Sequence, residues 1–430
     1  MSKSAALFFV ALILGLGWAI RGHFGHEWGA SWAGGMAALA VLTVAKRKDW
    51  SLRMPVLTTL GAIGWAVGGM MSYGLLIGYC RGNEFGNVLY GYTMLLVVGG
   101  LYGFIGGGLF GLGLESTEEK KPKWASLFAE MVAGAWIVWG FLIYQLEWLM
   151  TPPRSELWAA CLGAAAALAW HLRREGYLRA LRVAVYAMIG AGFGFAFGNF
   201  IQTMGTISGI SYNWWNVMEF TLGFCGGLGL VYAVVTRDWP ESVKPSKTAN
   251  WLAVLFVILA IPLTNLIDAF HHERMLNLAK SLGELNPEAF ASNQPLAGLV
   301  LLVVFFFIAI MVWLRAQNGK MDYIRILTPL ALFVYAGYYL VYGFLVKGFF
   351  YRSLSIGDSD ALYLPVLLLA LAIWFINRKK EIKLPLPGVR EESAKYWVLL
   401  VSVLILVLII ITFVSINSHA GIPGFQERFK

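Results

Sequence analysis

Charged side chains are scarce in this chain of 430 residues. They make up 13% of it, whereas an ordinary soluble domain carries about 25%. Apolar residues reach 59%, which excludes an intrinsically disordered chain. Three cysteines are too few for a scaffold stapled by disulfides. The sequence also lacks a phosphate-cradling P-loop, so nothing in it indicates ATP hydrolysis.

Long apolar runs dominate what is present. A helix needs roughly 20 apolar residues to cross about 30 Å of hydrocarbon. We therefore expect an all-α polytopic integral membrane protein with about 13 transmembrane helices, or 12 to 14 because three of the runs are short. The thirteen runs are 5–21, 28–45, 55–79, 87–114, 125–149, 156–172, 180–202, 214–236, 249–270, 296–315, 323–349, 361–377 and 395–416.

The positions of lysine and arginine predict the orientation of the chain. With thirteen spans, 24 of the 33 basic residues fall on the side of the N-terminus and 9 on the other side. Cytoplasmic loops carry such an excess, so we expect a cytoplasmic N-terminus and an external C-terminus, in a bacterial inner membrane. The net charge of +9 then reports topology and contact with membrane lipid. Because the basic residues are divided among loops, a nucleic-acid partner is not indicated.

A short string recurs near the outer ends of three runs. It reads Gly-Trp-Ala-Ile-Arg at 17–21, Gly-Trp-Ala-Val-Gly at 64–68 and Gly-Phe-Ala-Phe-Gly at 194–198. A weaker echo links 138–142 with 341–345. The alternative is chance recurrence in a chain with 48 glycines and 15% aromatic residues.

A duplication would divide the chain into two related halves. It predicts a first six-helix half at 1–176, a second at 177–380, and an extra helix with a short external tail at 381–430. Parallel repeats of this kind are common among secondary transporters. No loop is long enough for an independent soluble domain.

The most unusual polar segment, residues 21–29, joins the first two runs. It places Arg21, His23, His26 and Glu27 within seven residues at the outer boundary, between glycines that let the backbone bend. His23 and His26 would share a face if the segment were helical. Ionisable groups at membrane depth are costly and therefore indicate function.

Other uncommon polar residues reach the same outer level from different runs. Asn199 and Gln202 end the seventh run, and Glu219 lies near the start of the eighth. Asn265 and Asp268 end the ninth run, shortly after a proline that can free backbone carbonyls. Together with the segment at 21–29, these residues form the predicted substrate-binding site.

Three interpretations of these residues remain open. They could be solvated loop residues without a function. They could line a site for a solute and for proton coupling, because arginine binds carboxylate or phosphate and histidine or glutamate titrates. They could also hold zinc or act as a general base, but the His-Glu-x-x-His order that places two ligands and a base on one helix is absent. We assign no metal, no cofactor and no catalytic residue.

The leading hypothesis is a secondary transporter that moves a small polar or anionic solute, with a sugar-like solute as one option, and that uses proton or cation coupling. Arg21 would hold the solute, and His23, His26, Glu27, Glu219 or Asp268 would carry the coupling. The alternative is a membrane-embedded transferase or hydrolase that acts on a lipid-linked or extracytoplasmic substrate. A structural subunit of a larger complex is a third hypothesis. The sequence does not indicate the oligomeric state.

Overall fold

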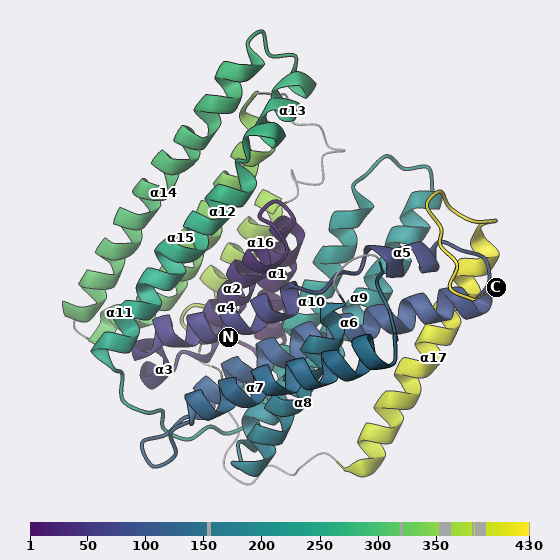
Figure 1. Cartoon of the computed structure of the whole chain (residues 1–430). Helices are drawn as coiled ribbons and strands as arrows, with labels where there is room; N and C mark the ends of the chain where they lie inside the picture. The colour runs from purple at the N-terminus through teal and green to yellow at the C-terminus, as the bar shows by residue number, and fades with distance from the viewer. Residues whose placement is uncertain (153–155, 319–320, 352–362, 381, 383–392, 430) are drawn as a thin grey trace.

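The computed structural model describes residues 1–152, 156–318, 321–351, 363–380, 382 and 393–429, without the side chains of 316–325. Over these residues the chain is helical and contains no strand (Figure 1). The helices, with two π-helical turns (η1, η2) and a 3-10 turn (η3), are α1 (Lys3–Arg21), α2 (Glu27–Ala45), α3 (Lys48–Leu52), α4 (Met54–Gly69), α5 (Gly74–Cys80), α6 (Phe85–Glu115), α7 (Trp124–Trp139), η1 (Gly140–Gln145), α8 (Leu157–Arg174), α9 (Leu178–Ile207), α10 (Trp214–Val235), α11 (Lys247–Leu255), η2 (Phe256–Ala260), α12 (Ile261–Ala269), α13 (His272–Leu282), α14 (Pro287–Asn318), α15 (Met321–Val346), η3 (Phe349–Tyr351), α16 (Tyr363–Asn377) and α17 (Ala394–Ser418).

The number of spans is close to the prediction. Among the described residues, ten helical segments are long and apolar enough to cross a membrane, and the bent pair α4–α5 would be an eleventh. Each predicted run overlaps one or more helical elements, but α16 has only 15 residues and α8 ends in a basic turn. The all-helical architecture is confirmed and is consistent with an integral membrane protein. The count of thirteen is not confirmed.

The run at 55–79 is not one straight helix. It is broken at 70–73, and α5 departs from the direction of α4 by 62°. Gly68 and Gly69 end α4, and a Cβ atom at Gly69 would lie 2.9 Å from the carbonyl oxygen of His26. Two glycines with low helix propensity, pressed against the α1–α2 loop, account for the end of α4 at this point.

The three recurring strings have one structural role, which is to bring neighbouring helices close together. A Cβ atom added at Gly17 would lie 3.0 Å from Ala33 in α2. At Gly64 it would lie 2.8 Å from the backbone of α6, and at Gly194 2.7 Å from a carbonyl oxygen of α10. Glycine therefore permits the crossings of α1 with α2, α4 with α6, and α9 with α10.

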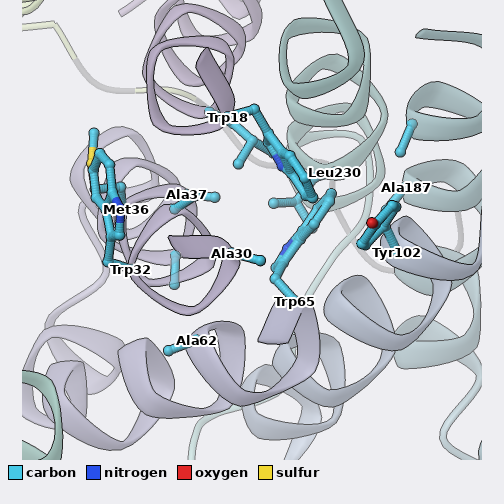
Figure 2. Packing of buried hydrophobic residues seen from close by; sticks show 14 of the residues in the cluster. Trp18, Ala30, Trp32, Met36, Ala37, Ala62, Trp65, Tyr102, Ala187 and Leu230 are labelled. Carbon is cyan, nitrogen blue, oxygen red and sulfur yellow. The ribbon is translucent and has the colours of Figure 1, made fainter. Parts of the chain in front are cut away.

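The aromatic residues that follow these glycines meet in the core. Trp18 and Trp65 pack edge to face with ring centroids 5.6 Å apart, and Figure 2 shows both beside Tyr102. Tyr102 lies 4.8 Å from Trp18 and 6.4 Å from Phe195, by ring centroids. Such aromatic pairs each contribute about 0.5–1.5 kcal/mol beyond the burial of their area. The aromatic residues of the three strings, which lie in α1, α4 and α9, therefore converge with Tyr102 on one buried cluster.

The predicted halves share this core. α6 packs along α9, and α1 packs along α10, so helices from 1–176 and 177–380 interleave. In Figure 1 these helices occupy the centre, with α11–α15 on one side and α17 on the other. The two-half symmetry and the three-part division with 381–430 stay predictions.

Loops assigned to the same side of the membrane lie together. The N-terminal amino group donates to a carbonyl of segment 378–380, and Lys46 donates to two carbonyls of that segment at 2.7 Å. Arg47 donates to the carbonyls of 239–240. Four segments predicted to be cytoplasmic therefore share one end of the bundle. That this end faces the cytoplasm stays a prediction from charge.

Candidate functional site

An ion pair at the C-terminal end of α1 forms the centre of the site. Arg21 is the last residue of α1, and its Nη2 lies 2.9 Å from Oε1 of Glu219 in α10. The two side chains are only 2% and 3% exposed. Burial of two charges is tolerated only when they are paired and hydrogen-bonded. Among the polar residues that the sequence singled out in different runs, Arg21 and Glu219 are brought into direct contact.

Tyr73 joins both charges from the break between α4 and α5. Its hydroxyl accepts a hydrogen bond from Arg21 and donates one to Glu219 at 3.0 Å. Trp215 lies one turn before Glu219 in α10. The rings of Tyr73 and Trp215 are tilted against each other with centroids 6.0 Å apart. The bend in the fourth segment thus places a hydroxyl on a buried ion pair.

Trp18 covers the other side of the guanidinium. The central carbon of Arg21 lies 4.4 Å from the Trp18 ring centroid, in a cation–π contact. The Nε of Arg21 is buried and has no hydrogen-bond partner among the described residues. Arg21 is therefore fixed in position, and the N–H of its Nε is not used.

A cavity of about 510 Å³ adjoins this triad. Tyr73 and Trp215 line it, with His26 from the α1–α2 loop, residues 151–152, and residues 424 and 426 of the segment after α17. Its size suits a small solute. Of the three residues of the triad, Tyr73 lines the cavity, and its hydroxyl contacts the ion pair.

The histidine-containing segment is a turn rather than a helix. Gly25 has a φ of +82°, and residues 22–26 lie between α1 and α2. His26 is exposed in the cavity with its ring centroid 6.0 Å from that of Tyr73. His23 is buried, and its ring faces Tyr363 at 6.1 Å. The two histidines therefore do not share a helical face, as a helical segment would have required.

Asn199 and Gln202 lie buried at the interface of α9 with α10. The Asn199 amide donates to the Gln202 side-chain oxygen at 2.8 Å. The same amide lies 3.7 Å from the sulfur of Met218, the residue before Glu219. They are adjacent to the segment that carries the ion pair, and they bond each other.

The residues of the ninth run belong to another part of the bundle. Asn265 is buried in α12 and donates to the Tyr339 hydroxyl of α15 at 2.9 Å. Asp268 is exposed, with a carboxylate oxygen 3.5 Å from the Cβ position of Gly25. Glu27 is also exposed, at the start of α2. The structure does not join these residues to the Arg21–Glu219 pair.

Two parts of the site were missed by the sequence interpretation. Tyr73 was one of many aromatic residues at span ends, and the glycines before it were the only signal of a break. The segment after α17 was expected to be a short external tail. Instead Asn87 accepts hydrogen bonds from the amides of Arg428 and Phe429, at 2.7 and 2.8 Å, and donates to the Phe429 carbonyl. This docking holds residues 424 and 426 at the cavity wall.

No group of three or more His, Cys, Asp or Glu side chains in the described part of the chain is arranged to hold a metal ion. Comparisons with protein-family models, with curated proteins and with solved structures gave no match. The site is therefore interpreted from its own chemistry: a buried arginine, a buried carboxylate and a bridging tyrosine beside a cavity.

Proposed function

We propose that this chain is a secondary transporter that moves a small anionic solute across the inner membrane with proton coupling. The observation that carries the proposal is the buried Arg21–Tyr73–Glu219 triad, whose Tyr73 lies at the break of a bent span and lines a solute-sized cavity. Helix breaks at membrane depth are the places where transporters bind substrates and ions.

The chemistry follows from charge balance. A solute carboxylate or phosphate that enters from the cavity competes with Glu219 for the guanidinium of Arg21. The unused Nε of Arg21 offers a second bond, so the solute is held by two donors. Once displaced, Glu219 takes up a proton and keeps its contacts with Tyr73. One anion and one proton then enter together, and the site stays neutral in both states.

The polar neighbours have supporting roles. His26 lies in the cavity through which the solute approaches. Asn199 and Gln202 donate and accept hydrogen bonds that a hydroxylated solute can take over after their mutual bond opens. Movement of α5 against α4 at residues 70–73 would carry Tyr73 away from the charges and open the site.

The test uses protein reconstituted into vesicles that contain a pH-sensitive dye. Lactate, succinate, gluconate and inorganic phosphate are added outside in turn, and at least one is expected to acidify the lumen. Arg21→Gln and Glu219→Gln are each expected to abolish this signal. Lys121→Gln and Glu84→Gln remove one positive and one negative charge from exposed positions outside the triad and the cavity wall, and both variants should retain the signal.

Proton entry that persists in both triad variants contradicts the proposal. A purified protein that moves none of the four anions, and that turns over a lipid-linked substrate instead, favours the membrane-enzyme alternative.

A further inference from the structure

The wall of the cavity beside the ion pair combines aromatic rings with neutral polar side chains. Tyr73 and Trp215 supply the rings, with centroids 6.0 Å apart and planes tilted by 31°. Ser72, Thr151 and Gln426 supply hydroxyl and amide groups, which both donate and accept hydrogen bonds. The proposed transport of an anion leaves the chemistry of the rest of the solute open, and these side chains bear on it.

Thr151 brings a buried hydroxyl to the cavity wall. Its side chain is 2% exposed, and its Oγ1 has no hydrogen-bond partner among the described residues. The backbone is held by Glu156, whose carboxylate accepts the amide N–H of Thr151 at 2.8 Å and that of Met150 at 2.9 Å. Trp158 donates to the same carboxylate at 2.7 Å. Because an unpaired buried hydroxyl is costly, this fixed residue favours a cavity content that can hydrogen-bond to it.

Gln426 reaches the cavity wall from the segment after α17. Its backbone amide donates to the carbonyl of Gly78 in α5 at 3.0 Å. A Cβ atom added at Gly78 would lie 2.6 Å from Cγ of Gln426, so glycine leaves the room that this side chain occupies. The hydrogen bonds between Asn87 and residues 428–429 anchor the same segment. An exposed amide, with an oxygen acceptor and two N–H donors, is thus held in the wall.

Tyr73 connects the cavity to the buried charges, because its hydroxyl hydrogen-bonds both members of the ion pair. The anionic group of a bound solute is therefore expected on the side of Tyr73. Hydroxyl groups along the rest of the solute would meet Thr151 and Gln426, and its C–H groups would pack on the aromatic rings. A plain hydrocarbon chain would leave the Thr151 hydroxyl unpaired, which selects against such a solute.

We propose that the solute is a polyhydroxylated carboxylate, such as a sugar acid, and that Thr151 and Gln426 bind its hydroxyl groups. The inference rests on the proposed function for the placement of the carboxylate. It adds two specificity-determining residues, one from the loop after η1 and one from the segment after α17. Polar groups of this kind discriminate strongly, because an analogue without hydroxyls leaves them unpaired.

The test is isothermal titration calorimetry of the full chain in detergent with gluconate, hexanoate and sorbitol. Gluconate and hexanoate share a carboxylate and the length of the carbon chain, whereas sorbitol shares the hydroxyls without the charge. Gluconate should bind more tightly than either, by about tenfold or more. Thr151→Val and Gln426→Met should each weaken gluconate binding about three- to tenfold, as expected for one neutral hydrogen bond, and should change hexanoate binding by less than about twofold.

Matched controls separate recognition from folding. Thr43→Val removes a buried hydroxyl that bonds within α2, and Gln145→Met removes an exposed amide at the end of η1. Both variants should keep gluconate binding within about twofold of the natural chain. Gly78→Ala should weaken gluconate binding as Gln426→Met does, because the added methyl group displaces the Gln426 side chain.

The outcomes separate this inference from the proposed function. Gluconate that binds no more tightly than hexanoate, or gluconate binding that is unchanged in both Thr151→Val and Gln426→Met, would overturn the inference, even when proton-coupled uptake of another anion upholds the transporter. Preferential gluconate binding that both variants weaken, without proton-coupled uptake of any anion, would support the ligand class and contradict the transporter.

Discussion

Replacing Arg21 by methionine would leave the Glu219 carboxylate buried without its cation. At the observed 2.9 Å, and with an effective dielectric constant of about 20, the attraction that is lost amounts to about 6 kcal/mol. Part of it is offset because arginine no longer has to be desolvated. Removal of one partner of a buried pair typically costs about 3–5 kcal/mol, and we expect a loss of stability in this range for Arg21→Met and for Glu219→Leu.

The double variant Arg21→Met with Glu219→Leu should be more stable than either single variant. It leaves no buried charge, and apolar side chains of similar volume refill the space. The Tyr73 hydroxyl loses both of its hydrogen-bond partners, Arg21 and Glu219, which costs about 1–3 kcal/mol. The expected stability is therefore about 1–3 kcal/mol below that of the natural chain, with a coupling energy of several kcal/mol between the two sites.

Unfolding in mixed detergent, followed by tryptophan fluorescence, measures these four stabilities, with the exposed Lys121→Met as the control. Proton-coupled uptake is measured on the same samples. We expect stability to return in the double variant and uptake to stay lost, because the charges are needed for binding and not only for folding. Single variants that lose less than about 1 kcal/mol would refute the buried ion pair. Uptake that returns in the double variant would refute its role in transport.

Three further predictions concern packing, the cavity wall and pH. Gly64→Val should lower stability by about 1–3 kcal/mol because its Cβ would lie 2.8 Å from the backbone of α6, whereas Gly74→Ala, with no described atom within 4 Å, should change it little in the same unfolding assay. Asn87→Ala should release the segment after α17, which limited proteolysis detects as faster cleavage near the C-terminus. Burial alone would raise the pKa of Asp49, but hydrogen bonds from Arg47 and from backbone amides hold this pKa below its ordinary value of 3.8. The ionised Asp49 carboxylate therefore stabilises the folded protein above about pH 3.8, and this contribution is lost as the pH falls below that value. Asp49→Asn should weaken the loss of stability in acid, which unfolding measured at several pH values around 3.8 would detect.

The helical segments were predictable because lipid leaves few alternatives. An apolar run of about 20 residues must satisfy its own backbone, and the helix does so within one segment. The exceptional polar residues were also visible, since Arg21 and Glu219 interrupt otherwise apolar runs. Their pairing was not, because 198 residues separate them and the pairing depends on how α1 packs on α10.

The rest of the site depends on contacts that no local pattern encodes. Tyr73 resembles any tyrosine at the end of a span, whether its hydroxyl faces water or a buried ion pair. His23 and His26 have helical spacing, but the glycine-rich segment turns instead, with Gly25 at positive φ. The segment after α17 looks like a polar tail, and only its hydrogen bonds to Asn87 reveal that it forms part of the cavity wall.

The separation of Arg21 from Glu219 along the chain has a consequence for biosynthesis. At about 5–20 residues per second, the ribosome needs about 10–40 s to make the 198 residues between them. During that interval α1 and α2 can already cross at Gly17, but the guanidinium lacks the carboxylate that will neutralise it. Its place in the last residue of α1 lets the long side chain reach the wet boundary and stay hydrated. The ion pair can therefore form only after α10 has been inserted. The packing of α1 and α2 around Arg21 is completed only at that stage.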